Sequence, residues 1–118
     1  MPTVLIIDDS PTQTAYLRET LQGQGLRIMH RSSAMLGNIG LAAEQVDLVL
    51  IALILTAQNG FECGLALREN AFSNIMLYCD CPTDSDAEWA MAIGLRGVMT
   101  IPAPLQTLRR QLGALLYA

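Results

Sequence analysis

The amino-acid sequence predicts one α/β domain, a three-layer sandwich in which helices cover both faces of a five-stranded parallel sheet. Short apolar runs alternate with longer helical stretches along all 118 residues. Hydrophobic residues make up 52% of the chain, which is enough for a full core in a single domain spanning residues 1–118. Right-handed crossovers make the sheet parallel, with ligand sites at the strands' carboxyl ends.

Five short apolar runs are the expected strands. The third run, residues 48–55, is apolar without interruption, which is typical of a strand buried on both faces at the centre of a parallel sheet. The other four runs are residues 3–7, 26–30, 75–79 and 98–101, of which 26–30 is the weakest.

The first two expected helices follow the first two strands. Ser10 and Pro11 indicate a helix start, with a hydroxyl N-cap and proline at the first helical position. A second helix is expected over residues 33–45. Gly37 and Gly40 should weaken it by roughly 1 kcal/mol each relative to alanine. Its apolar face would carry Leu36, Ile39 and Ala43.

Three further helices are expected in the second half of the chain. The first covers residues 61–70. Ser85-x-x-Glu88 reads as a capping box that opens the next helix, which ends at Gly94. Residues 102–104, Pro-Ala-Pro, bend the chain into the last helix. The apolar face of that helix carries Leu105, Leu108, Leu112 and Leu115.

The charged residues exclude several functions. All seven bases are arginine, so the chain offers no P-loop lysine and no lysine Schiff base. The single histidine, His30, excludes zinc motifs that need two or three imidazoles. A net charge of -4 and scattered arginines argue against nucleic-acid binding.

The sequence favours a cytoplasmic location. The first apolar run breaks at Asp8 and Asp9, so it is not a signal peptide, and no stretch approaches the roughly 18 apolar residues of a membrane span. Cys63, Cys79 and Cys81 suit a reducing compartment better than a disulfide framework. Cys79-x-Cys81 as a redox or metal fragment is an alternative that lacks further ligands.

Asp8 and Asp9 form an acid pair where the first strand ends, at the expected ligand edge. Adjacent carboxylates repel one another and call for a compensating cation. Mg²⁺ fits, because it takes hard oxygen ligands. The alternative is a pair of acids near a helix N-terminus, favoured by the macrodipole.

The motifs VLIIDDS (4–10), DLVLI (47–51), NGFE (59–62), Gly94 and TIP (100–102) occur in one order. This pattern resembles, over essentially the whole chain, the receiver domain of chemotaxis-regulator-like two-component response regulators. The resemblance implies a flavodoxin-like, doubly wound fold with the strand order 2-1-3-4-5. In that family a histidine kinase passes a phosphoryl group to an aspartate ending the third strand. Mg²⁺, held partly by the acid pair, neutralises the developing charge. A Thr or Ser after the fourth strand and a Lys after the fifth then hold the aspartyl phosphate.

The chain departs from that pattern at several positions. The acid pair matches, but the phosphoacceptor position falls at Ala52, whose methyl group is neither a nucleophile nor a metal ligand. The hydroxyl position falls at Tyr78, whose ring is several ångströms too long, and the lysine position falls at Ile101. The aromatic switch position falls at Val98. An engineered Asp→Ala change would explain Ala52 but not the set, so natural degeneration to a pseudo-receiver is the simpler account.

Two other acids were weighed as the acceptor. Asp47 opens the third strand, so it should lie roughly 17 Å from the acid pair, which excludes it. Asp80, just past the fourth strand, is on the correct edge and could form a substitute cluster with Asp9. The alternative is a loop acid that caps the turn before Pro82.

The resemblance also implies a partner surface, formed by the fourth helix, fifth strand and last helix. Tryptophan and arginine commonly anchor interfaces. A homodimer through this face is one option, and solvated arginines with a self-covering tryptophan are the other. Tyr16 and Arg18, beside the acid pair, are candidates for a kinase contact. The predicted surface consists of Trp89, Met91, Arg96, Arg109 and Arg110.

Two hypotheses of function follow. The first is a non-enzymatic signalling module that acts by phosphorylation-independent association with a kinase, receptor or regulatory complex. It would bind neither nucleic acid nor membrane, and Mg²⁺ weakly at most. The second is a phosphoaccepting receiver with its acceptor relocated to Asp80 and Mg²⁺-dependent autodephosphorylation. Flavin binding has little support, because the loop after the first strand is acidic. With no effector domain after Ala118, output is expected in trans, unless the chain belongs to a longer protein.

Overall fold

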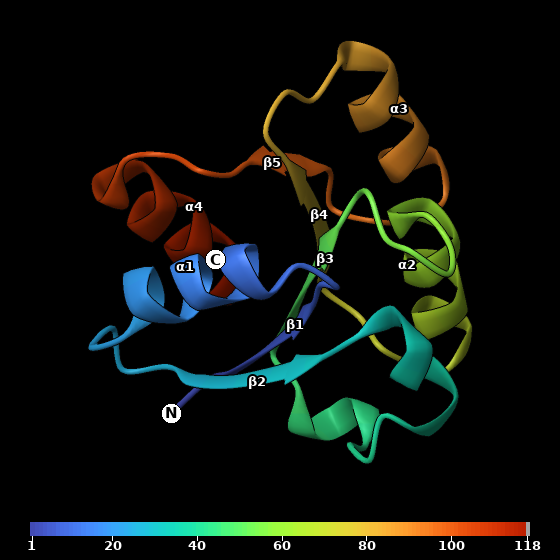
Figure 1. Ribbon diagram of the computed structural model, residues 1–118, viewed down its shortest axis with the longest axis horizontal. Coiled ribbons are helices and arrows are strands. Elements are labelled where there is room, and N and C mark those ends of the chain that lie inside the picture. Colours follow the sequence, from blue (N-terminus) through green and yellow to red (C-terminus); the bar gives the residue numbers. More distant parts are fainter. Residues whose placement is uncertain (118) are drawn as a thin grey trace.

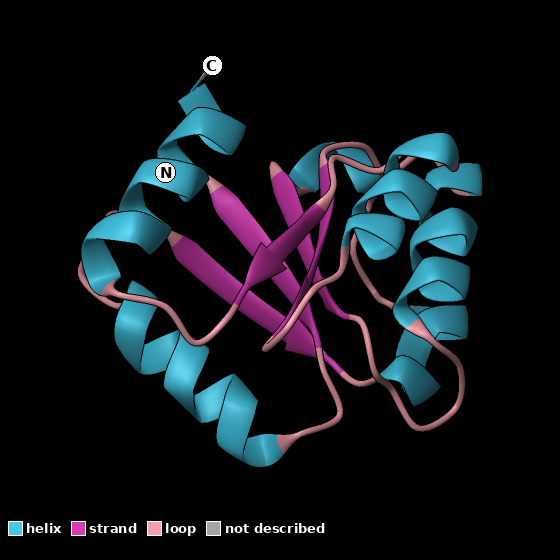
Figure 2. Cartoon of the chain, turned by 90° about the horizontal axis from the view of Figure 1, so that it is seen from above, coloured by secondary structure: helices cyan, strands magenta, loops and turns pink. Residues whose placement is uncertain are grey.

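In the computed structural model, which describes residues 1–117, a five-stranded parallel sheet lies between two layers of helices (Figure 1). The strand order is β2-β1-β3-β4-β5, as the sequence predicts. Figure 2 shows the sheet between its two helical layers. The strands are β1 (Thr3–Ile7), β2 (Arg27–Arg31), β3 (Leu48–Ala52), β4 (Ile75–Cys79) and β5 (Val98–Thr100).

Within the described residues 1–117, four α-helices cover the sheet, two on each face. Helices α1 (Pro11–Leu21) and α4 (Leu105–Tyr117) lie on one face, and α2 (Gly60–Glu69) and α3 (Asp84–Ala92) lie on the other (Figure 1). None of the helices within residues 1–117 combines the length and hydropathy that a membrane crossing requires.

The core consists of two aliphatic clusters, one on each face of the sheet. Successive β1 residues alternate between them, because side chains along a strand point to opposite faces. Val4 and Ile6 pack with α1 and α4, whereas Leu5 and Ile7 pack with α2 and α3. Strand β3 is buried along its whole length. The prediction of a central strand covered on both faces is therefore confirmed.

The helix expected over residues 33–45 is wrong. The segment instead forms two 3₁₀ helices, η1 (Ser33–Asn38) and η2 (Ala43–Gln45). Gly40 lies between them with φ of 72°, a left-handed conformation that a continuous right-handed helix cannot include. The connection between β2 and β3 therefore contains short 3₁₀ helices, whereas each of the other three crossovers contains an α-helix.

The helix start expected at Ser85 and Glu88 is also wrong. The capping box is formed two residues earlier by Thr83 and Asp86. The Thr83 hydroxyl accepts the Asp86 N–H at 3.1 Å, and the Asp86 carboxylate accepts the Thr83 N–H at 2.9 Å. Ser85 lies inside the helix, so its hydroxyl is not the cap.

The third strand is shorter than the apolar run predicts. It ends at Ala52, and the Leu53 carbonyl accepts the Gly60 N–H at 2.8 Å, which closes a turn into α2. Ile54 belongs to that turn and is 82% exposed. The bounds of β2, β5 and α2 differ from those expected by a residue.

Candidate functional site

The positions singled out from the sequence meet at the carboxyl edge of the sheet. Asp8 and Asp9 follow the end of β1, and Ala52 is the last residue of β3. Tyr78 is the register partner of Ala52 on β4, and Ile101 follows β5. The expectation that these residues share one edge is confirmed.

Both carboxylate oxygens of Asp8 accept hydrogen bonds from the protein. The Ser10 N–H donates to Oδ1 at 2.9 Å, and the Tyr78 hydroxyl donates to Oδ2 at 2.5 Å. Asp8 is 2% exposed and Tyr78 is 1% exposed, so water does not compete for this pair. The length of the Tyr78 ring carries its hydroxyl to the acid pair.

The small side chain of Ala52 explains how a buried tyrosine fits beside it. The two residues are neighbours on adjacent strands and belong to the same core cluster. A larger residue at position 52 would compete with the ring for space. Burial, followed by the hydrogen bond to Asp8, raises the pKa of the Tyr78 hydroxyl far above its usual range. The phenol therefore remains protonated and acts as a donor.

Asp9 ties three loops of the site together. Its Oδ1 accepts the Ser33 N–H at 2.7 Å. Its Oδ2 accepts the Ser33 hydroxyl at 2.6 Å, and the N–H and hydroxyl of Thr56 at 2.8 and 2.9 Å. Burial would raise the pKa of Asp9, but these hydrogen bonds outweigh it and lower the pKa to about 2. Asp9 is therefore an ionised acceptor at the centre of the loops that follow β1, β2 and β3.

Sequence reasoning missed Ser33 and Thr56. Each is a hydroxyl residue that follows a strand end at the ligand edge, two residues past β2 and four past β3. A search for hydroxyl residues just after parallel strands would have selected them, but their common acceptor becomes visible only in the fold.

The site does not fit the Mg²⁺ that the family resemblance implies. All four carboxylate oxygens of Asp8 and Asp9 already accept hydrogen bonds from the protein. Ala52 contributes no oxygen where an acidic ligand is expected. Within residues 1–117, no three acidic, histidine or cysteine side chains lie close enough together to hold a metal ion. The donor set is that of a hydrogen-bonded structural site.

The structure does not join Asp80 to the acid pair. Asp80 is exposed on the loop after β4, and with Ala52 it lines a shallow surface pocket. Within residues 1–117, no potential metal-binding group of acidic, histidine or cysteine side chains includes Asp80. Asp47 lies at the opposite edge, as predicted, where its carboxylate accepts the Thr3 N–H at 2.7 Å. The described residues therefore form no substitute acidic cluster of three such side chains, and Asp80 as an acceptor stays a prediction.

Ile101 and Cys79 also lie at the carboxyl edge of the sheet. Ile101 is buried in the same core cluster as Ala52 and Tyr78, so the position expected to hold a cation is apolar. Strand β4 ends at Cys79, one residue past Tyr78. Cys63, Cys79 and Cys81 are free thiols.

Comparisons with known proteins place this geometry in context. No family model matches the chain. A curated relative, Protein PilH of Pseudomonas aeruginosa, is 26% identical over 119 residues, covering 98% of each chain. The heme response regulator HssR of Staphylococcus saprophyticus is also 26% identical, but the chain spans only 52% of its length.

Solved structures share the whole fold. A two-component response regulator from Clostridium difficile superimposes with a TM-score of 0.84 at 21% identity, covering 98% of this chain and 96% of that one. CheY in the CheX–CheY–BeF3–Mg complex of Borrelia burgdorferi gives 0.87 at 13% identity, covering 99% and 90%. The chain has the receiver-domain fold of response regulators.

Trp89 and Met91, assigned from the sequence to one partner surface of the receiver, point to different sides of α3. Two residues apart on an α-helix, their side chains lie about 200° apart around the helix axis. Ala90 between them is buried and faces the core. Trp89 leans toward α2, where its ring meets the edge of Phe61 with 6.0 Å between centroids. Trp89 therefore does not belong to the edge beside β5.

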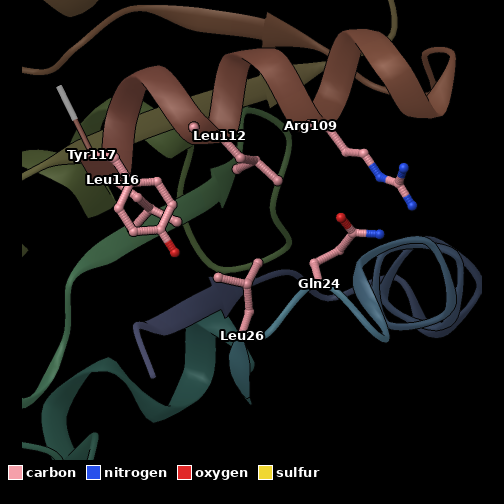
Figure 3. A pocket seen from close by; sticks show the side chains of 7 residues that line it. Gln24, Leu26, Arg109, Leu112, Leu116 and Tyr117 are labelled. Carbon is pink, nitrogen blue, oxygen red and sulfur yellow. The ribbon is translucent and has the colours of Figure 1, made fainter.

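The three arginines of the predicted surface are also dispersed. Arg96 donates to the Asn74 side chain at 2.8 Å, next to the first residue of β4 and so near the amino edge of the sheet. Arg109 of α4 extends toward Gln24 over a small pocket, as Figure 3 shows. Arg110 is exposed on the same helix. A partner surface that includes these five residues stays a prediction.

The residues predicted to contact a kinase near the acid pair are Tyr16 and Arg18, and that contact stays a prediction. The Tyr16 hydroxyl donates to the Ala103 carbonyl at 3.2 Å and so ties α1 to the segment before α4. Arg18 is exposed on α1 and remains available to a partner.

Proposed function

We propose that this receiver-like domain serves signal transduction of the two-component type by binding other proteins, without phosphoryl transfer to an aspartate of its own. The observation that carries the proposal is the buried hydrogen bond from Tyr78 to Asp8, formed directly beside Ala52. The family pattern expects a phosphoacceptor and a metal at this point. A core tyrosine and a methyl group stand there instead.

The chemistry of the neighbouring positions supports the proposal. Ala52 has no atom that could attack a phosphoryl donor. Ile101 has no charge to hold an acyl phosphate, and the chain contains no lysine to replace it. Each of these departures alone would impair the reaction, and together they remove its nucleophile and its cation.

The hydrogen bonds of Asp9 support a site that keeps one arrangement. Phosphorylation switches work by moving loops between two packings. Here Ser33 and Thr56 hold the loops after β2 and β3 on one ionised carboxylate. Without a phosphoryl group to compete for these donors, the loops remain a fixed part of the surface offered to partners.

A protein partner is the remaining element of the proposal. The Borrelia burgdorferi neighbour is described as a CheX–CheY complex, which is a precedent for this fold in a protein assembly. We propose a cytoplasmic signalling protein as the partner and no catalytic turnover by the domain itself.

Phosphorylation with acetyl phosphate and Mg²⁺ tests the proposal. Intact-mass spectrometry should show no phosphoryl adduct on this chain, while a phosphorylatable receiver in the same reaction gains one. A hydroxylamine-sensitive adduct on the wild type would refute the proposal. Its loss in Asp80→Asn, with retention in Asp84→Asn, would establish the relocated acceptor instead.

A further inference from the structure

An apolar patch lies across the outer faces of α2 and α3. We define the α2–α3 patch as Phe61, Leu65 and Trp89. Trp89 is 60% exposed and Leu65 is 39% exposed, while the half-buried Phe61 meets the indole edge-to-face. Phe61 and Leu65 are four residues apart on α2, so they lie one above the other on the same side of that helix. The three side chains form a surface that no part of the described chain covers.

Helix α2 packs closely against the turn that follows α3. A Cβ atom on Gly64 would lie 2.6 Å from the Leu95 side chain, and one on Gly94 would lie 2.4 Å from the Arg68 guanidinium. These glycines let α2 approach the turn after α3. Figure 1 shows the two helices together on the side of the sheet opposite α1 and α4.

The two helices that carry the patch are strongly negative. Helices α2 and α3 carry five acids and one arginine, a net charge of -4 that equals the charge of the whole chain. Helices α1 and α4 carry three arginines and one glutamate. Glu69 continues the line of Phe61 and Leu65 at the end of α2, where the macrodipole disfavours an acid. Glu62 and Asp86 belong to capping boxes and Asp84 lies in the first turn of α3, so helix stability accounts for those three acids but not for Glu69.

We infer that the α2–α3 patch binds a basic amphipathic helical segment of a partner protein. Apolar side chains of the segment would pack on Phe61, Leu65 and Trp89, and its lysines or arginines would face Glu62, Glu69 and Glu88. The negative charge disfavours nucleic acid and anionic lipid as occupants. The inference rests on the proposed function, because it identifies the kind of partner through which a phosphate-independent receiver would act.

Trp89, the single tryptophan of the chain, reports binding directly. The probe is a synthetic peptide of about 14 residues with leucine and lysine at amphipathic helical spacing. Added to the intact protein in about 0.1 M salt, it should shift the Trp89 emission to shorter wavelength. The same peptide with glutamate in place of lysine should not.

Matched variants separate a specific site from general attraction of charge. Leu65→Gln and Glu69→Gln should each weaken binding of the leucine–lysine peptide about tenfold, or about 1.4 kcal/mol. Leu105→Gln on α4, where the leucine is 40% exposed, and Glu19→Gln on α1 should leave it unchanged. Far-UV circular dichroism checks that all four variants are folded.

Three outcomes would overturn the inference. They are the absence of any emission shift, an equal loss of affinity in the α1 and α4 variants, and concentration-dependent dimerisation that buries Trp89 without peptide. The last result would show that the occupant is a second copy of the chain. Because the titration contains neither phosphate donor nor Mg²⁺, its outcome is independent of the phosphorylation assay.

Discussion

Replacing Tyr78 with phenylalanine removes one oxygen atom and leaves the Asp8 carboxylate without its buried donor. The hydroxyl donates to Oδ2 at 2.5 Å, and both residues are almost fully buried, so water cannot replace the lost bond without opening the site. A hydrogen bond to a charged group contributes about 1.5–3 kcal/mol, and a buried unsatisfied acceptor costs a similar amount. We expect Tyr78→Phe to lower the free energy of unfolding by about 2–3 kcal/mol, since the ring itself is retained.

Urea denaturation followed by circular dichroism measures this loss directly. The midpoint should fall while the slope of the transition stays unchanged, because the surface exposed on unfolding is nearly the same. Tyr117→Phe is the matched control, since Tyr117 is 69% exposed and should change stability by less than about 0.5 kcal/mol.

The pH dependence gives a second, independent reading of the same bond. Burial raises the pKa of the Tyr78 hydroxyl above its usual value, so the native state keeps this proton while the unfolded chain loses it above about pH 10. The native state then binds more protons, and wild-type stability should fall with rising pH by up to about 1.4 kcal/mol per pH unit. Tyr78→Phe should lack this component.

A Tyr78→Phe protein as stable as wild type at neutral pH would refute the reasoning. It would mean that the Asp8 carboxylate finds solvent or another donor at no cost. The same conclusion would follow if the two proteins lost stability in parallel above pH 10.

Three further predictions concern the acid pair and the packing around it. Asp9→Asn should make the free energy of unfolding less dependent on pH in acid. The Asp9 pKa of about 2 lies below its value in the unfolded chain, so the wild type loses about 1–2 kcal/mol as pH falls from about 4 to 2. Urea titrations at several pH values measure this loss, with Asp80→Asn as the control. Cys63→Ala should reduce the loss of stability above about pH 8.5. Burial, followed by the charge of Asp9, raises the Cys63 pKa to about 12, so the native thiol stays protonated while the unfolded thiol ionises. Parallel curves of unfolding free energy against pH for the variant and the wild type would contradict this. Gly60→Ala should destabilise the protein by at least about 1 kcal/mol, since its Cβ would lie 2.7 Å from the Ala52 carbonyl oxygen. Gly113→Ala, with open space around it in α4, should stabilise the protein by up to about 1 kcal/mol. Thermal melts that rank the two variants in the opposite order would show that neither packing nor helix propensity decides their stability.

The fold could be predicted from the sequence because its determinants are local. The unbroken apolar run that contains β3 indicates burial on both faces, and Ser10-Pro11 starts α1 within a single turn. These signals depend on neighbouring residues, so they survive without knowledge of the fold. The predictions failed where a local signal had a competitor: Thr83 and Asp86 cap α3 in place of Ser85 and Glu88.

The use of the acid pair was decided only by the tertiary structure. Asp8 and Asp9 could be placed at the ligand edge from the sequence, but their partners are far away along the chain. Tyr78 is 70 residues from Asp8, and Thr56 is 47 residues from Asp9. Parallel strands with crossovers bring such distant strand ends to one edge, and a hydrogen bond depends on ångström distances that no residue pattern contains. The sequence by itself therefore determined the sheet, its order and the place of the acid pair at its carboxyl edge. The tertiary structure decided that Tyr78, Ser33 and Thr56 take the acid pair's oxygens, and that Trp89 faces α2.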